Sequence, residues 1–324
     1  MPELKAPPFG KRLRILTWHV HGNYLYYLTQ VPHDFYLVHD DERSTHHSGR
    51  IGNLPWGDNV HEVHVDEVAK QSFDVVLFQS RDAWQTHQHR YLSAAQRRLP
   101  RIYLEHDTPF DSPTDSRHWM DDPQVLLVHV THYNALMWDT GPVPTRVVEH
   151  GVRLLEGVQY SGVDPRGVVV VNNLDRRGRR VGHDVFQSVA QEVPLVLIGM
   201  GSDRVPGGHG EVENNALPKT MAAFRFFFNP IRYTSLGLAV IEAMMCGLPI
   251  VGLATTELVT VIRNGQEGFL DTRLDTLKDT MRQLIANPGL ARHWGEAARR
   301  TALERFAIER FVDDWLRTFN EVTG

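Results

Sequence analysis

The sequence predicts an α/β protein built from two doubly wound domains. Its 324 residues are more than a single hydrophobic core usually holds, so two domains are expected. Short apolar runs alternate with helical patterns through both halves, which is typical of parallel sheets covered by helices. The chain also opens with a strand, a loop and a helix, the order in which a doubly wound domain begins.

The first half, residues 1–155, is predicted to form one of the two domains. Compact apolar runs indicate its strands, and a polar stretch over about 40–60 indicates a long loop that is either functional or mobile. The expected strands are Leu13–Thr17, Phe35–Val38, Val75–Phe78, Ile102–Leu104, Val125–Val130 and Pro144–Val148, and the expected helices are Tyr24–Thr29 and Tyr133–Trp138.

The second half, residues 156–305, repeats the alternation after a boundary expected near 152–166, where Gly, Ser and Pro thin out the apolar pattern. A last segment, 306–324, carries a helix over Phe306–Phe319 with an aromatic packing stripe at Phe311, Trp315 and Phe319. The other expected elements are strands at Val168–Val171, Leu195–Ile198, Phe224–Phe228 and from Ile250, and helices at Leu217–Ala223, Leu238–Cys246, Leu274–Ala286 and Leu290–Arg305.

Composition and charge exclude several classes of function. Hydrophobic residues make up 42% and charged residues 23% of the chain, as in an ordinary globular protein, and the formal net charge is −5. Neither half has a positive balance, which argues against nucleic acid as the main ligand. No apolar run is long enough to span a membrane and no apolar signal core precedes the first strand, so we expect a cytoplasmic protein. Peripheral contact with a membrane is compatible with these features.

Histidines in the loops of the first half raise the question of a metal site. Their spacing is loose, and neither a cysteine nor an HExxH helix accompanies them. The single cysteine, Cys246, falls in an apolar run, where packing is its expected role. We therefore expect no metal ligand and interpret the histidines as solvated. They are His19, His21, His46, His47, His61, His64, His87 and His89.

A cationic loop follows the first strand of the second half. Four arginines, Arg176, Arg177, Arg179 and Arg180, fall at the carboxyl end of that strand, where an anionic ligand would bind. The planar guanidinium group suits phosphate oxygens two at a time. A solvated basic turn is the alternative. The later pair Gly199 and Gly201 resembles part of a dinucleotide fingerprint, but no third glycine or helix follows in register, which argues against NAD.

The most informative stretch runs from Asn229 to Leu270. A turn at Ser235–Gly237 leads into an apolar helix, and a helix N-terminus offers unpaired amides and a partial positive charge to a phosphate. About a turn later, Glu242 interrupts the apolar run and could hold a pair of sugar hydroxyls. The pattern predicts a site for a nucleotide-diphosphate sugar. The alternative is a core helix whose glutamate is paired internally.

In the first half, His106 and Asp107 follow a central strand and are expected to point into the ligand crevice. A loop histidine that is hydrogen-bonded to its neighbour is the alternative.

The stretch 229–270 resembles the signature region of retaining glycosyltransferases of family 4, which have the GT-B fold. Glu242 occupies the place of the family's second glutamate and is followed by AMMCGLPIVG. Thr234 occupies the place of the first glutamate, which in the family contacts the transferred sugar, and Pro230 matches the proline of a Pro-Ser pair. Downstream residues in register are Asn264, Gly265 and Gly268, and His150-Gly151-Val152 is similar to the family's Asn-Gly-Val turn before the domain linker.

The resemblance implies a hexosyltransferase-like enzyme (EC 2.4) that takes a UDP- or GDP-sugar as donor, retains configuration and uses no metal or other cofactor. It implies two Rossmann-like domains facing across a cleft, with an acceptor-side domain over 1–155, a nucleotide-sugar domain over 156–305 and a helix over 306–324 that crosses back to the first domain. The acceptor and the oligomeric state are left unidentified. The residues implicated are His106, Asp107 and Thr234 as catalytic or sugar-facing, and Gly22, Arg176, Arg180, Gly201, Val212, Ser235, Leu236, Gly237, Leu238 and Glu242 as donor-binding.

Thr234 leaves rival functions open, because it lacks the carboxylate that would hold sugar hydroxyls. One rival is a nucleotide-sugar-binding protein, or a weakly active subunit, that uses the same site without transfer. The other is a nucleotide-sugar epimerase of the same fold.

Overall fold

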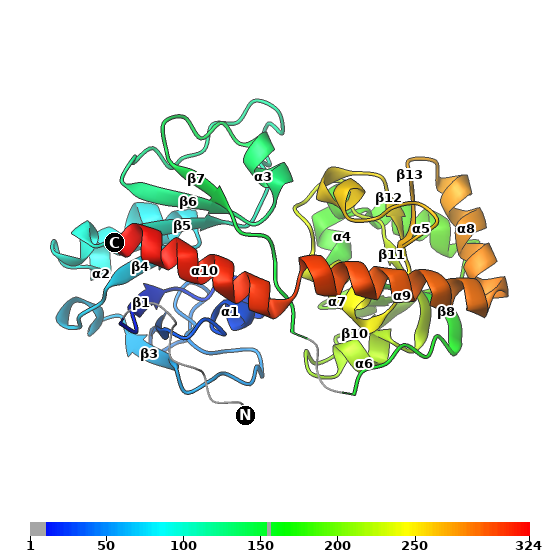
Figure 1. Ribbon diagram of the computed structural model, residues 1–324, viewed down its shortest axis with the longest axis horizontal. Helices are drawn as coiled ribbons and strands as arrows, with labels where there is room; N and C mark the ends of the chain where they lie inside the picture. The colour runs from blue at the N-terminus through cyan, green and yellow to red at the C-terminus, as the bar shows by residue number, and fades with distance from the viewer. Residues whose placement is uncertain (1–10, 154–156) are drawn as a thin grey trace. The chain divides into compact units, whose positions relative to one another are not determined.

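The computed structural model describes residues 11–153 and 157–324 and shows two compact α/β units (Figure 1). The first unit comprises Met1–Gly151 together with Ile308–Gly324, and the second comprises Val152–Ala307. Each contains one parallel sheet with helices packed on it, which confirms the predicted fold class. The boundary predicted between 155 and 156 lies outside the described residues.

The first unit is built on a seven-stranded parallel sheet in the order β3-β2-β1-β4-β5-β6-β7. This is the strand order of a Rossmann-type sheet, in which the direction of winding reverses between β1 and β4. The strands are β1 Arg14–Thr17, β2 Asp34–His39, β3 Val60–His64, β4 Val75–Phe78, β5 Arg101–Glu105, β6 Val125–His129 and β7 Thr145–Val147. The helices are α1 Gly22–Leu28, α2 Gln88–Tyr91, α3 His132–Met137 and α10 Ile308–Thr323, with short segments η1 Val68–Lys70, η2 Ala83–His87 and η3 Gln96–Arg98.

The C-terminal helix α10 belongs to the first unit. Its aromatic stripe, Phe311, Trp315 and Phe319, is fully buried, and the Trp315 indole N–H donates to the Tyr24 hydroxyl at 3.3 Å. Gly151 permits the close approach of the helix, because a Cβ atom there would lie 2.1 Å from the Phe311 Cβ. The predicted packing stripe is therefore confirmed. The predicted start at Phe306 is wrong, since the Phe306 backbone N–H donates to Ala302 and closes the preceding helix.

The second unit repeats the same winding in a six-stranded parallel sheet of order β10-β9-β8-β11-β12-β13. Here the winding reverses between β8 and β11. The strands are β8 Asp164–Val170, β9 Leu195–Ile198, β10 Gly208–Gly210, β11 Phe224–Asn229, β12 Ile250–Leu253 and β13 Gly268–Asp271. The helices are α4 Leu174–Arg177, α5 His183–Ala190, α6 Leu217–Met221, α7 Leu238–Cys246, α8 Leu274–Ala286 and α9 Pro288–Arg305, with η4 Gly178–Val181, η5 Ser202–Arg204 and η6 Thr256–Thr260.

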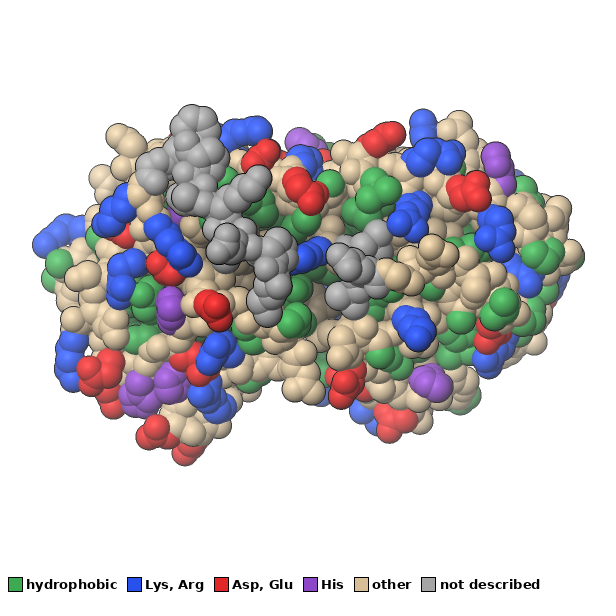
Figure 2. Space-filling model, turned by 60° about the horizontal axis from the view of Figure 1, so that its bottom comes forward, with side chains coloured by type: hydrophobic (Ala, Val, Ile, Leu, Met, Phe, Trp, Pro, Cys, Tyr) green, Lys and Arg blue, Asp and Glu red, His purple; other side chains and the backbone are tan. Residues whose placement is uncertain are grey.

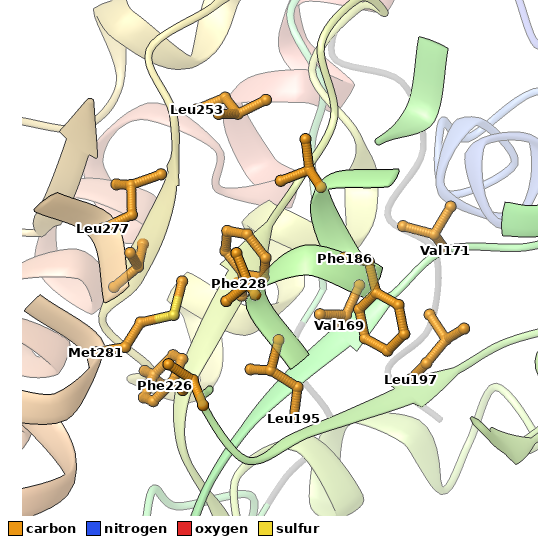
Figure 3. Close-up of a cluster of buried hydrophobic side chains, with 14 of the residues drawn as sticks. Val169, Val171, Phe186, Leu195, Leu197, Phe226, Phe228, Leu253, Leu277 and Met281 are labelled. Carbon is orange, nitrogen blue, oxygen red and sulfur yellow. The ribbon is translucent and has the colours of Figure 1, made fainter. Parts of the chain in front are cut away.

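Alternate residues of the central strands build the core of the second unit (Figure 3). Phe226 and Phe228 of β11 extend to the same face, as expected for residues two apart on a strand. Helix α5 covers this face with Phe186, and α8 adds Leu277 and Met281. The core thus fixes the positions at which β8 and β11 end.

The sequence pattern missed the strands β3, β10 and β13, the helices α2 and α5, and the short segments η1, η2 and η3. Strand β3 reads VHEVH and β10 reads GHG, so neither is an apolar run. The arginine-rich stretch, predicted as a loop, contains the short helices α4 and η4, and the stretch after β12 forms η6 followed by β13. One turn of 3₁₀ helix, η5, forms where no helix was expected.

The surface carries charges of both signs. Figure 2 shows Lys and Arg side chains interspersed with Asp and Glu over both units on the face drawn, without a field of one sign. In the described parts of the chain, no helix combines the length and apolar character needed to cross a membrane.

Candidate functional site

Two predicted parts of the ligand site lie at the switch point of the second sheet. In open parallel sheets, ligands bind beyond the carboxyl ends of the strands, where the winding reverses. The arginine-rich stretch follows β8, and the turn that leads into α7 follows β11, the neighbour of β8 in the sheet. The topology therefore brings together segments that are about 60 residues apart in sequence, a separation that parallel crossover connections allow.

Backbone contacts join these two segments directly. The N–H groups of Arg232 and Tyr233 donate to the carbonyl oxygen of Arg180 at 3.0 and 3.2 Å. Gly182 has a φ of +82°, and a Cβ atom there would lie 2.0 Å from the Pro230 carbonyl oxygen, so glycine is required for both conformation and space. The Arg232 guanidinium also holds the Asp184 carboxylate with contacts of 2.5 and 2.7 Å.

The N-terminus of α7 is open to a ligand. Gly237 is its N-cap residue in an extended conformation, with φ −71° and ψ 136°, and provides no side-chain hydrogen bond. A Cβ atom at Gly237 would meet nothing within 4 Å. The first amides of the helix therefore have no capping side chain, which is the arrangement that attracts an anion. Thr234 and Ser235 are half-buried beside this end, and Leu236 is buried below it.

Glu242 lies about one turn further along α7, in a run that is buried from Val240 to Cys246. Its side chain is 7% exposed, so its carboxylate is largely withdrawn from water and depends on hydrogen-bond donors. Burial, together with the nearby Glu242 charge, raises the pKa of the Cys246 thiol to about 12. Cys246 is therefore an unreactive packing residue.

The arginines that follow β8 have different surroundings. Arg179 is committed to Asp184, with an Nη1–Oδ2 distance of 2.5 Å. Arg177 extends toward the Asn172 carbonyl oxygen at 3.5 Å. Arg176 is exposed on α4 and forms no ion pair with any residue that the structure describes, and Arg180 is half-buried on η4. The donor-binding roles of Arg176 and Arg180 stay predictions.

An ion pair joins the segment after β9 to the arginine-rich segment after β8. Arg204 forms a two-pronged ion pair with Asp175 of α4, with both N–O distances 3.0 Å, and this lowers the pKa of Asp175 to about 2. Gly201 has a φ of +68°, and a Cβ atom there would lie 2.3 Å from the Arg204 guanidinium. Val212 is half-buried after the edge strand β10, at a distance of three places from β11 in the sheet order. The donor-binding roles of these residues stay predictions.

In the first unit, His106 follows β5 and Gly22 begins α1 directly beyond β1. The His106 ring is 8% exposed and lies 4.3 Å from the His21 ring and 4.8 Å from the Tyr24 ring, measured between centroids. Burial first, and then the charges of His21 and His150, hold the pKa of His106 well below its usual value. His106 is therefore a neutral imidazole at neutral pH.

Gln79 determines which nitrogen of His106 carries the proton. The Gln79 amide nitrogen donates to the Thr17 hydroxyl at 2.9 Å and to the Trp18 carbonyl at 3.0 Å, which orients the amide. Its oxygen therefore faces His106 Nε2 at 3.1 Å as an acceptor. His106 must be protonated on Nε2, and its Nδ1 is left as an acceptor for a hydroxyl donor. Sequence reasoning missed Gln79, although a polar residue directly after an apolar strand was a usable signal.

A buried acid supports the strand end that carries His106. Glu105 Oε1 accepts from the Asp107 backbone N–H at 2.8 Å, and Oε2 lies 3.0 Å from His118 Nε2. Burial raises the pKa of Glu105 to about 8, while backbone N–H groups of Asp107 and His106 oppose the shift. His118 Nδ1 accepts from Met120, so its Nε2 is the protonated nitrogen that donates to Glu105. Asp107 itself is fixed by its carbonyl, which accepts from the Trp138 indole at 2.9 Å.

The interpretation of the loop histidines as solvated is wrong for three of them. His19, His47 and His87 are 8%, 7% and 9% exposed, because the polar stretch after β2 folds back over the ends of β1 and β4 instead of extending into water. No group of three or more His, Cys, Asp or Glu residues suited to a metal ion occurs in the described ranges 11–153 and 157–324.

Residues 208–301 match the protein family described as glycosyl transferases group 1. This range begins at β10, ends within α9 and includes α7 with Glu242. The chain is also 25% identical over 202 residues to the GDP-mannose-dependent alpha-(1-6)-phosphatidylinositol dimannoside mannosyltransferase of Mycobacterium tuberculosis. That alignment covers 62% of this chain and 45% of the mycobacterial protein.

Solved structures resemble the chain over residues of both units. Sucrose-phosphate synthase from Thermosynechococcus elongatus superposes with a TM-score of 0.71 at 15% identity, over 96% of this chain and 99% of that one. HepE from Anabaena, solved with UDP and glucose, gives a TM-score of 0.69 at 14% identity, over 96% of this chain and 100% of that one.

The solved structures show that the chain has the GT-B fold, and residues 208–301 of the second unit resemble the group 1 glycosyl transferases. The resemblance found in the sequence between 229 and 270 is confirmed. The chain spans less than half the length of the curated relatives that it matches.

Proposed function

We propose that the chain is a retaining, metal-independent glycosyltransferase that moves a sugar from a UDP- or GDP-sugar to an acceptor. The observation that carries the proposal is the switch point of the second sheet. There an uncapped helix N-terminus adjoins an arginine-rich segment, and a withdrawn carboxylate follows one turn later. A diphosphate on the amides and arginines, with its ribose on Glu242, fits this order of groups.

Transfer from such a donor depends on stabilising the diphosphate as it leaves. In this proposal, the α7 amides and the guanidinium groups of Arg176 and Arg180 are the positive partners for that developing charge. His106 supplies a neutral ring with a free acceptor nitrogen, suited to a hydroxyl of the sugar. The donor's base and sugar are supported only as a class: the mycobacterial relative is named for GDP-mannose, and HepE was solved with UDP.

The test is calorimetry of the chain with UDP, GDP, UDP-glucose and GDP-mannose, followed by a donor-hydrolysis assay. Glu242→Ala should weaken nucleotide-sugar binding by about 10–100-fold, the effect of losing hydrogen bonds to a charged acceptor. The matched control is Glu267→Gln. Glu267 is also fully buried in the second unit, but it is bound to Arg263 and to the Thr301 hydroxyl. This control should lower thermal stability and leave the dissociation constant unchanged.

An unchanged dissociation constant in Glu242→Ala would remove Glu242 from the site. Thr234, at the position of the family's first glutamate, favours one second candidate, a nucleotide-sugar binder without transfer. Tight binding of a donor with no turnover toward water or any acceptor would establish that candidate.

A further inference from the structure

Four groups of the first unit hold the turn formed by His106 and Asp107, directly after β5. Three of these groups are neutral. The Asn134 side-chain amide donates to the His106 carbonyl oxygen at 3.1 Å. The Trp138 indole donates to the Asp107 carbonyl oxygen at 2.9 Å, and the Gln79 oxygen faces the His106 ring at 3.1 Å. Because amides and indoles do not titrate near neutral pH, these three supports keep their hydrogen bonds as pH changes.

The fourth support is the carboxyl group of Glu105. Its Oε1 accepts from the Asp107 backbone N–H at 2.8 Å, and the His106 backbone N–H is hydrogen-bonded to the same group. Its Oε2 lies 3.0 Å from His118 Nε2. Glu105 is 5% exposed and His118 is 3% exposed, so both side chains are withdrawn from water. Of the four supports, Glu105 is the one that can change its charge.

Only the ionised form of Glu105 matches the groups around it. His118 Nδ1 accepts from the Met120 backbone N–H at 2.9 Å, which fixes the ring proton on Nε2. The carboxyl group therefore faces three N–H donors, and a carboxylate accepts from all of them. A protonated carboxyl would present an O–H to these same donors, so one hydrogen bond to the turn or to His118 would be lost.

Burial and hydrogen bonding oppose each other at Glu105. Burial favours the protonated form and raises the pKa of Glu105 to about 8, and the Asp107 charge adds to the shift. The other titratable groups that face it are His118, His129 of β6, which is its partner in register, and Tyr103 of β5. Burial lowers the pKa of His118 to about 4 and that of His129 to about 3, and it raises the pKa of the Tyr103 hydroxyl. These three side chains therefore stay neutral while Glu105 gains or loses its proton.

We propose that Glu105 is a positioning residue for sugar transfer, whose ionised form holds the turn of His106 and Asp107 in the arrangement that supports turnover. This inference rests on the proposed function. Glu105 acts through the turn and not by contact with the sugar. Protonation removes a hydrogen bond from this support, so turnover should rise with pH. Binding of the diphosphate, which is assigned to the second unit, should not follow the same titration.

The first test is the pH profile of donor hydrolysis by the wild-type chain, with UDP-glucose and GDP-mannose as donors. We expect kcat to rise about tenfold between pH ~7 and pH ~9, because the ionised fraction of one group with a pKa of about 8 changes by that factor. Calorimetry over the same range should give dissociation constants for UDP and GDP that show no midpoint near pH ~8.

Two variants separate the titrating support from a neutral one. Glu105→Gln places an amide N–H₂ group against an N–H donor, so kcat should fall about tenfold at pH ~9 and the rise with pH should disappear. Trp138→Phe removes the indole donor to the Asp107 carbonyl, so it should lower kcat and leave the midpoint of the profile unchanged. A variant with a merely structural role would lower stability without removing the titration.

A measurement on the wild-type chain does not depend on the folding of any variant or on activity. In ¹⁵N-labelled protein, the amide signal of Asp107 should shift with pH and show a midpoint near pH ~8, because this N–H donates to the titrating carboxyl group.

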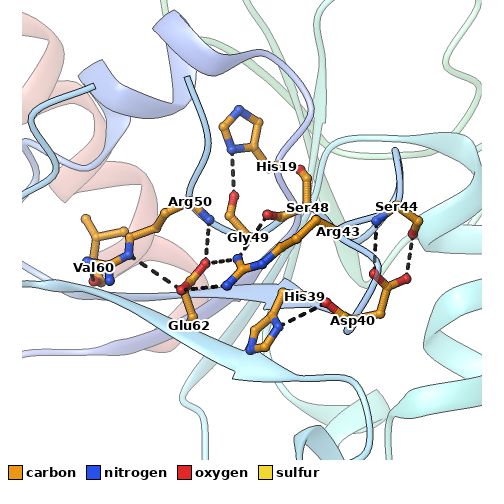
Figure 4. Close-up of polar contacts among 10 residues, drawn as sticks. All are labelled: His19, His39, Asp40, Arg43, Ser44, Ser48, Gly49, Arg50, Val60 and Glu62. Carbon is orange, nitrogen blue, oxygen red and sulfur yellow. Dashed lines mark hydrogen bonds and ion pairs between the residues drawn. The ribbon is translucent and has the colours of Figure 1, made fainter. Parts of the chain in front are cut away.

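The matched control is Glu62→Gln (Figure 4). Glu62 of β3 is also a carboxylate of the first unit, accepts from the Arg50 backbone N–H at 2.7 Å and forms an ion pair with Arg43. As Figure 4 shows, these bonds fasten the polar stretch that follows β2, and not the turn at His106. Glu62→Gln should lower stability and leave the pH profile of turnover unchanged.

Three results would overturn the proposal: a kcat that does not rise between pH ~7 and pH ~9, a rise that persists in Glu105→Gln, or an Asp107 amide signal without a midpoint in this range. Failure of the proposed function has a different signature. In that case the Asp107 amide signal titrates as expected, but the chain neither binds nor hydrolyses any nucleotide sugar.

Discussion

The two sheets share one winding but carry opposite chemistry at their carboxyl ends. Beyond β8 and β11, the second unit presents arginines and open amides. Beyond β1, β4 and β5, the first unit presents neutral imidazoles, an oriented amide and a buried acid. All eight buried histidines of the described residues lie in the first unit, and the described histidines of the second, His183, His209 and His293, are half-buried or exposed.

The two sheets have the same strand order, so the difference lies in the residues that follow the strands. Fixed charges favour a diphosphate. Neutral groups held away from water favour hydroxyls, because they recognise hydrogen bonds without attracting ions.

The largest expected effect is that acid unfolds the first unit before the second. Burial lowers the pKa of His33, His87 and His118 to about 4 and that of His129 to about 3. Each is neutral when folded and takes up a proton on unfolding, so its contribution to stability is complete above pH ~6.5 and is lost as pH falls toward the folded value. At roughly 1.4 kcal/mol per pH unit per group, several kcal/mol are lost by pH 5.

Hydrogen exchange by mass spectrometry at pH 7 and pH 5 measures this effect, and faster exchange should be confined to the first unit. Glu105 acts in the opposite sense. With a folded pKa of about 8, it stabilises the fold at low pH and loses that effect as pH rises, so it offsets about one histidine. His129→Leu should move the acid transition to lower pH, because both ring nitrogens lack partners in the described chain. His209→Leu is the control, and equal acceleration in both units would contradict the comparison.

The next largest effect concerns the arginines that follow β8 in the second unit. Arg176→Ala and Arg180→Ala should each weaken UDP or GDP binding about 10–100-fold, as for the loss of a charge-assisted hydrogen bond to phosphate. Raising the salt concentration should weaken binding by the wild-type chain more than by either variant. Calorimetry provides the measurement.

The control for this pair is Arg179→Ala, because Arg179 is 76% exposed and already holds Asp184. Its affinity should stay within about threefold of the wild type, the scale of an exposed ion pair. A loss at Arg179 equal to that at Arg180 would mean that the cluster acts by net charge and not by position.

The smallest effect concerns the neutral His106 and its partner Gln79 in the first unit. Gln79→Leu removes the acceptor that holds the proton on His106 Nε2, and Gln79→Glu should raise the pKa of His106 by placing a carboxylate there. In both variants we expect turnover to fall about tenfold, which is in the range for misplaced polar groups, and nucleotide affinity to stay unchanged. ¹⁵N NMR of His106 reads the tautomer.

Gln96→Leu is the matched control, since Gln96 is equally buried in the first unit and donates to the carbonyl oxygens of Val68 and Gln71. Gln96→Leu should lower stability and leave the tautomer of His106 unchanged. An unaltered tautomer in Gln79→Leu would show that Gln79 only packs.

Prediction from sequence succeeded where the pattern was local. Strands such as β4 and β6 are continuous apolar runs, and α7 has clear start and stop residues in Gly237 and Gly247. It failed at β3, whose alternating VHEVH pairs with β2 in a register that only the sheet supplies. It also misjudged His47, because the Arg43–Glu62 ion pair that folds its loop back joins residues 19 positions apart.

The sequence by itself determined the class of this protein: two wound α/β units, with a helix tip, arginines and a glutamate in an order that suits a nucleotide-diphosphate sugar. These features depend on residues that are close together in the sequence, so local sequence patterns can predict them. Only the tertiary structure decided that Arg180 lies against Tyr233, that Gln79 orients His106 and that His47 is withdrawn from water. Burial and proton position depend on neighbours brought from distant parts of the chain, which a local pattern does not contain.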